Sequence, residues 1–139
     1  MFSHRNSASL VQAVSPDGQQ HGNSAAVEYA VQSLKVAHLI VLGHSSCGGV
    51  QGCIDMCQGK APQLDEKSSF VGRWMDILRP KYEIVADIED RAEQVRQLEK
   101  HAVITSLENL LTFPWCAEQV KDGKLTSHGL LTDIGEGGL

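Results

Sequence analysis

The feature that most limits how this chain can fold is a short apolar run at residues 36–43, with the sequence VAHLIVLG. The run is rich in branched side chains and almost uninterrupted, which is typical of a strand buried on both faces of a parallel sheet. Helical spacing of apolar residues predicts a helix before it, from Asn23 or Ser24 to about Lys35. A short helix is expected after it, at residues 50–59. This order of elements predicts an α/β fold, in which helices flank a mainly parallel central sheet.

The remaining segments predict further elements of the same fold. A second strand is expected within residues 124–138, where KLTSHGLLTDIGEGG ends in a glycine-rich turn. The segment from about Ile84 to Leu111 has helical spacing, and its pattern allows two helices with a break near His101. Residues 2–14 are expected to hold one short strand. A chain of 139 residues with 42% hydrophobic content fits a single domain, residues 1–139.

Charge and hydropathy argue against several classes of partner. The chain has 12 basic and 17 acidic residues, a net charge of −5 and no basic cluster, so neither nucleic acid nor a membrane surface is an expected partner. The longest apolar stretch, Val36 to Leu42, is too short to cross a bilayer. The first residues do not resemble a signal peptide, so a cytoplasmic protein is expected. Its four cysteines are then expected to be reduced thiols, one or more of them a metal ligand.

The turn after the apolar run carries the candidate chemistry. It reads GHSSCGGV and places His44 and Cys47 three positions apart, just beyond the predicted strand. In open α/β sheets the functional site lies beyond the carboxyl ends of the strands. Histidine nitrogen and cysteine thiolate are both ligands that zinc prefers. His44 and Cys47 are therefore candidate zinc ligands, and no other catalytic residue is identifiable.

A structural interpretation of the same turn stays open at this point. A free cysteine is often a small buried residue, and a hydrogen bond alone can hold a histidine at a strand end. A phosphate site is not expected, because the turn has neither a GxGxxG pattern nor the lysine and hydroxyl pair of a P-loop. Core packing is expected for Cys53, Cys57 and Cys116. Structural roles are expected for the remaining histidines, which are His4, His21, His38, His101 and His128.

Several segments, in order, resemble the β-class carbonic anhydrases. Residues 21–50 resemble the part of that family in which a Gly-His-x-x-Cys-Gly-Gly turn supplies two zinc ligands. FSHRN near the start resembles the family's Phe-x-x-Arg-Asn strand. The similarity continues through the segments SFVGRWMDILRP, SLENLLTFPW and SHGLLTDIGEGGL, and therefore covers nearly the whole chain.

The resemblance implies a carbonic anhydrase, or carbonate dehydratase, which is a lyase that hydrates CO2 reversibly to bicarbonate on a zinc-bound hydroxide. It implies Zn2+ as the cofactor, with His44 and Cys47 as two of its ligands, and a homodimer or larger homo-oligomer. The family's third ligand is the cysteine of an upstream Cys-x-Asp-x-Arg motif, which these 139 residues do not contain. The resemblance thus implies that the first strand of the family's sheet is missing, as in a truncated form or fragment.

Three interpretations of the missing motif follow. The chain is a shortened form or fragment of an active lyase, or a non-catalytic pseudoenzyme that acts as an oligomerisation or partner subunit. In the third interpretation, Cys53 or Cys57 replaces the missing ligand. The third is the least favoured, because both cysteines point along the predicted helix and away from its N-terminus.

Overall fold

The centre of the structure is a two-stranded parallel sheet. The computed structural model describes residues 1–17, 19 and 21–135. In it β1 (His38–His44) pairs with β2 (Thr126–Thr132), in a register that sets His38 opposite Thr126 and His44 opposite Thr132. The predicted fold class, a parallel sheet with flanking helices, is confirmed. The glycine-rich end of the second predicted strand, at residues 136–138, lies outside the described residues.

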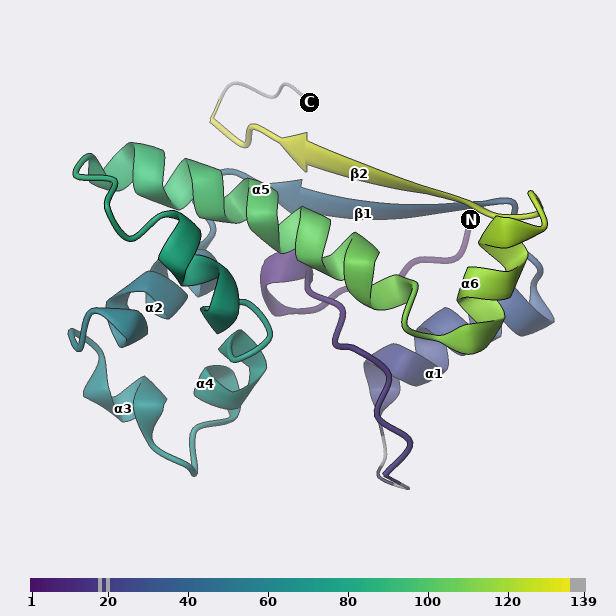
Figure 1. Ribbon diagram of the computed structural model, residues 1–139, viewed down its shortest axis with the longest axis horizontal. Helices are drawn as coiled ribbons and strands as arrows, with labels where there is room; N and C mark the ends of the chain where they lie inside the picture. Colours follow the sequence, from purple (N-terminus) through teal and green to yellow (C-terminus); the bar gives the residue numbers. More distant parts are fainter. Residues whose placement is uncertain (18, 20, 136–139) are drawn as a thin grey trace.

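The longest helix, α5 (Arg91–Leu110), lies along one face of this sheet (Figure 1). Glycine allows the close approach, since a Cβ at Gly43 would lie only 2.7 Å from Cγ2 of Val103. The other face leaves Ile40, Leu42 and Leu130 exposed. The prediction that residues 36–43 are buried on both faces is therefore wrong for the described structure, because alternate side chains of β1 reach the surface.

Shorter helices gather at the two ends of the sheet (Figure 1). One end holds α2 (Gly48–Cys57), α3 (Pro62–Asp65), α4 (Phe70–Met75) and the 3-10 helix η3 (Arg79–Ile84). The other end holds α1 (Gly22–Glu28), its π-helical continuation η2 (Tyr29–Ser33), and α6 (Pro114–Lys121). Each end has its own apolar cluster, and α5 contributes side chains to both. Among the described residues, no helix has the length and apolar character that a membrane span requires.

The N-terminal segment differs from its prediction. Residues 2–14 contain a 3-10 turn, η1 (Ser7–Ser9), where a strand was expected. Side chains of α5 make hydrogen bonds to the backbone of this segment, which a neighbouring strand would otherwise make. The N–H of Val11 donates to Oγ of Ser106 at 3.0 Å, and Nδ2 of Asn109 donates to the oxygen of Val11 at 2.8 Å. These bonds hold the segment against α5 as an irregular strap.

Helix α5 also differs from its predicted extent. It starts at Arg91, later than predicted, because the Asp90 side chain caps it by accepting the N–H of Glu93 at 2.8 Å. Of the two alternatives that the pattern allowed, one helix or two with a break near His101, the structure has one, since neither glycine nor proline occurs between the ends of α5. One continuous helix therefore connects the two apolar clusters.

Candidate metal centre

His44 and Cys47 lie on a sharp turn that joins β1 to α2. His44 is the last residue of β1, and Cys47 immediately precedes the first residue of α2. Between them Ser46 has a left-handed backbone, with φ of 55°. The turn brings both predicted residues to the wall of one small cavity. Their role as metal ligands stays a prediction at this point.

The cavity is of the size that a single water or metal ion occupies. Its volume is about 10 Å³, close to the minimum for one water molecule. Apolar side chains and the bare backbone of Gly43 form much of its wall, and the polar side chains on it are His44, Cys47 and Glu99. The site is therefore small, and it lies between β1, the start of α2, α5 and Ala8 of the N-terminal segment.

A hydrogen bond selects the tautomer of His44. Its Nδ1 lies 2.8 Å from the backbone oxygen of Ser45. A carbonyl oxygen can only accept, so Nδ1 carries the proton and donates this bond. In the neutral ring the lone pair is then on Nε2, which is the arrangement found in metal-binding histidines whose other nitrogen is held by a carbonyl.

Glu99 is the residue of this site that sequence reasoning missed. It comes from α5, is 3% exposed, and its Oε1 accepts the backbone N–H of Cys47 at 2.8 Å. The bond satisfies an N–H group at the start of α2 and holds Cys47 in place. A signal existed in the sequence, because Glu99 is four residues after Val95 and three before Ala102, on the apolar side of α5.

Replacement of Glu99 with methionine is expected to lower the free energy of unfolding by about 1 to 3 kcal/mol. Methionine fills a similar volume but leaves the buried N–H of Cys47 without its acceptor. Glu99→Gln is the matched control, because glutamine keeps an acceptor oxygen at that place. Urea unfolding of both variants measures the difference. Equal losses in the two variants would show that the hydrogen bond does not hold the turn.

Comparison with known proteins shows which family the chain belongs to. Residues 1–139 match the family model described as carbonic anhydrase. The chain is also 36% identical to Beta carbonic anhydrase 3 of Arabidopsis thaliana, over 98% of this chain and 52% of that protein. This chain belongs to the β-carbonic anhydrase family. The resemblance seen in the sequence is thereby confirmed.

Solved structures of β-carbonic anhydrases have the same fold as this chain. The β-carbonic anhydrase CcaA superposes with a TM-score of 0.82 at 27% identity, over 98% of this chain and 59% of that one. Tetrameric β-carbonic anhydrases from Sordaria macrospora superpose with a TM-score of 0.76 at 29% identity, over 98% of this chain and 64% of theirs. This chain spans about half the length of the curated relatives it matches.

The other three cysteines of the chain pack in its interior. Cys53 and Cys116 are buried and Cys57 is half-buried, and none of the three lines the cavity with His44 and Cys47. Burial, together with the neighbouring Cys57 thiol, raises the pKa of Cys53 to about 12. Burial likewise raises the pKa of Cys57 and of Cys116. The predicted core packing is confirmed, and the structure does not bring Cys53 or Cys57 to the site as a third ligand.

Alkylation at pH 8 is expected to leave Cys53 unmodified in the folded chain. The thiolate is the reactive form, and a rise in pKa from 9.0 to about 12 lowers its fraction at this pH about a thousandfold. Mass spectrometry after iodoacetamide treatment, with and without urea, locates the modified thiols. Labelling of Cys53 in the folded chain as fast as in urea would contradict its placement in the core.

The donor set of the cavity matches zinc in type but not in number. A histidine nitrogen and a cysteine sulfur are common zinc ligands, and a catalytic site takes three protein ligands plus water. Within the described ranges, no three His, Cys, Asp or Glu side chains form a group that could hold a metal ion. His44 and Cys47 therefore offer two donors of the type that zinc prefers, fewer than a catalytic site takes, and no reaction step through zinc follows from the described residues of one chain.

Proposed function

We propose that this chain takes part in the reversible hydration of CO2 to bicarbonate, with His44 and Cys47 supplying two ligands to Zn2+. Membership of the β-carbonic anhydrase family supports the reaction. The observation that carries the proposal for this chain is the placement of both side chains on one ion-sized cavity at the end of β1. The third protein ligand comes from a second copy of this chain in a homo-oligomer, because the described residues of one chain form no group of three.

Each residue of the turn has a distinct part in this proposal. His44 offers Nε2, because its Nδ1–H is held by the oxygen of Ser45. Cys47 offers its sulfur, and Glu99 keeps it in place through the backbone N–H. Zinc, when bound, would supply a Lewis acid that makes water a nucleophile near neutral pH. The rest of the cavity wall is apolar, formed by Ala8, Gly43, Val50, Ala102 and Val103.

A second candidate function is that of a non-catalytic subunit of a β-carbonic anhydrase assembly. The incomplete donor set of the described residues favours it. This candidate requires the fold and its surfaces but no bound metal. The two candidates therefore differ in what they predict for zinc.

Metal content and CO2 hydration by the purified chain distinguish the two candidates. The first predicts about one zinc per chain and a hydration rate above that of buffer, with both lost in Cys47→Ala and His44→Ala. Cys57→Ala is the matched control, because it removes a thiol that does not line the cavity. With Co2+ in place of zinc, a sulfur-to-metal absorption band that disappears in Cys47→Ala identifies the ligand. Folded chain without zinc or activity would support the non-catalytic subunit.

We further propose that the chain forms a homo-oligomer. The related enzymes from Sordaria macrospora are tetrameric. Helix α4 carries two apolar side chains at the surface, Phe70 at 92% exposed and Val71 at 52% exposed, and exposed apolar groups of this kind mark protein interfaces. Light scattering is expected to give a mass of at least a dimer. A monomer at all accessible concentrations would contradict this proposal.

A further inference from the structure

Two histidines for which only structural roles were expected, His38 and His128, contact each other on the exposed face of the sheet. His38 is the first residue of β1, and His128 lies on β2 opposite Ile40, so the two are diagonal neighbours. Nδ1 of His38 lies 3.1 Å from Nε2 of His128, and the ring centroids are 5.3 Å apart. We propose that this pair is a second metal site, which binds a divalent transition-metal ion through both imidazoles and so connects β1 to β2.

The separation of the two nitrogens suits a shared metal ion. Imidazole nitrogens bind zinc at about 2.0 to 2.1 Å, and two nitrogens 3.1 Å apart would then subtend about 100° at the metal. That angle lies between those of square-planar and tetrahedral sites, the geometries of Cu2+, Ni2+ and Zn2+. Without metal, one ring donates its N–H to the other. On binding, that proton moves to the far nitrogen of its own ring, so both facing nitrogens offer lone pairs.

The sheet holds the two histidines in place before any ion binds. The strands are paired in register, and the N–H of Thr126 donates to the oxygen of Ala37 at 2.9 Å, just beside His38. Gly129, which follows His128, faces α5 so closely that a Cβ there would lie 2.8 Å from Cγ1 of Val103. Because successive residues of a strand point to opposite faces, His128 points away from α5. A site on two such strands needs little rearrangement to bind.

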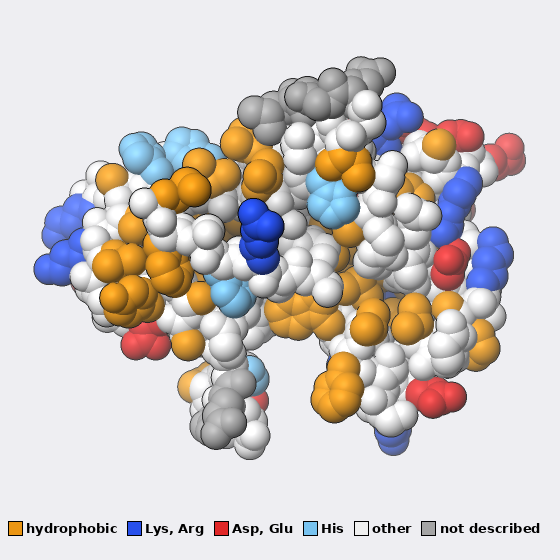
Figure 2. All heavy atoms as spheres, turned by 180° about the vertical axis from the view of Figure 1, so that it is seen from behind, with side chains coloured by type: hydrophobic (Ala, Val, Ile, Leu, Met, Phe, Trp, Pro, Cys, Tyr) orange, Lys and Arg blue, Asp and Glu red, His pale blue; other side chains and the backbone are white. Residues whose placement is uncertain are grey.

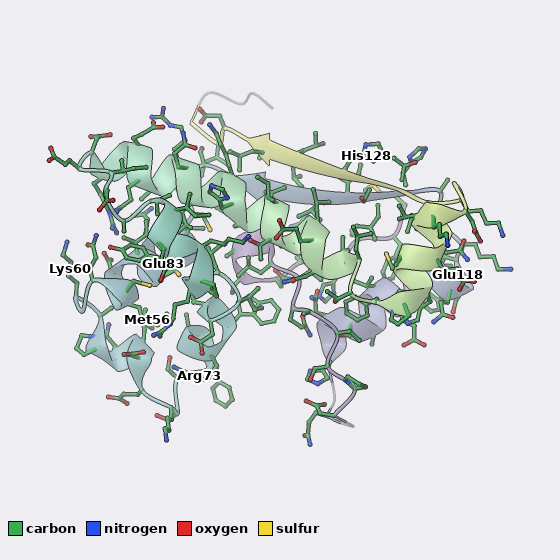
Figure 3. The ribbon with its side chains drawn as sticks, in the orientation of Figure 1. Met56, Lys60, Arg73, Glu83, Glu118 and His128 are labelled. Atoms are coloured by element: carbon green, nitrogen blue, oxygen red, sulfur yellow. The ribbon has the colours of Figure 1, made fainter. Side chains whose placement is uncertain are left out.

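The pair is separate from the His44 and Cys47 turn. His38 and His44 are the two ends of β1, which places them about 20 Å apart along the strand. Figure 3 shows His128 on β2, well away from the labelled Met56 and Lys60 beside α2. On the side of the molecule opposite α5, Figure 2 shows histidine side chains at the surface beside a group of hydrophobic ones. Both rings are exposed, so water completes the coordination of a bound ion.

Calorimetric titration of the full chain with Ni2+ tests the site. Nickel suits imidazole ligands and does not oxidise the four thiols of this chain. The titration is carried out in a His44→Ala, Cys47→Ala background, which removes the other pair of donors. We expect His38→Ala or His128→Ala to weaken Ni2+ binding at least about tenfold, since even a second-shell change costs that much. His4→Ala is the matched control, because His4 is also exposed but lies outside the sheet.

The double variant and the melting temperature provide two further tests of the His38 and His128 site. If both imidazoles bind one ion, the double variant His38→Ala, His128→Ala loses less binding free energy than the sum of the losses in the two single variants. Ni2+ is also expected to raise the melting temperature of the background protein, and not that of the double variant. Unchanged Ni2+ affinity in the single variants would overturn the proposal. A single variant that binds one Ni2+ fewer, with the affinity of the remaining site unchanged, would also overturn it, because that result indicates two independent single-histidine sites.

Discussion

Replacement of Leu98 with alanine is expected to lower the free energy of unfolding by about 2 to 5 kcal/mol. Leu98 is fully buried, in the apolar cluster where α5 meets α2, and its neighbours there include Ile54, Met75 and Val85. Loss of its side chain removes buried apolar surface and leaves a cavity that packed helices cannot fully close. Urea unfolding followed by circular dichroism measures the change.

Ile104→Ala is the matched control for this substitution. Ile104 belongs to the same helix but is 44% exposed, so its loss is expected to cost less than about 1 kcal/mol. Similar costs for Leu98 and Ile104 would mean that α5 does not pack as described. The Glu99→Met variant provides a second comparison on this helix, because it removes a polar contact and keeps a side chain of similar volume.

A methyl group at Gly72 is expected to be the most disruptive small substitution in the α3 and α4 region. A Cβ there would lie 1.7 Å from the backbone oxygen of Leu64. A backbone oxygen cannot change rotamer as a side chain can, so α4 must shift to relieve the overlap. Because Ser69 caps α4 by accepting the N–H of Gly72 at 3.0 Å, that shift also weakens the cap. We expect Gly72→Ala to cost at least about 3 kcal/mol, at the upper end for overpacking.

The same substitution at Gly22 is the control, and the opposite sign is expected. A Cβ at Gly22 would meet nothing within 4 Å, and Gly22 starts α1 without a left-handed backbone. Gly22→Ala is therefore expected to stabilise the chain by about 0.4 to 1 kcal/mol, because alanine reduces the entropy of the unfolded state. Thermal unfolding of the two variants side by side gives both signs. Destabilisation by Gly22→Ala would show a contact that the structure does not contain.

Prediction from sequence succeeded where the cause of the structure is local. The branched run at residues 36–43 predicted β1, because such side chains favour an extended backbone. Prediction failed where residues far away in the sequence determine the structure of a segment. Residues 2–14 were expected to form a strand, but Ser106 and Asn109 of α5 hold this segment as an irregular strap. The exposed face of β1 was also unpredicted, since burial depends on what covers a strand and not on its own residues.

The sequence by itself determined the turn that presents His44 and Cys47. A strand end, a short loop and a helix start lie within the five residues 44–48, so local backbone preferences are sufficient. Only the tertiary structure decided which distant side chains contact this turn and the strand before it. Glu99 reaches Cys47 across 52 residues, and His128 reaches His38 across 90. Those contacts depend on the parallel pairing of β1 with β2 and on the packing of α5, whose geometry no local pattern of residues specifies.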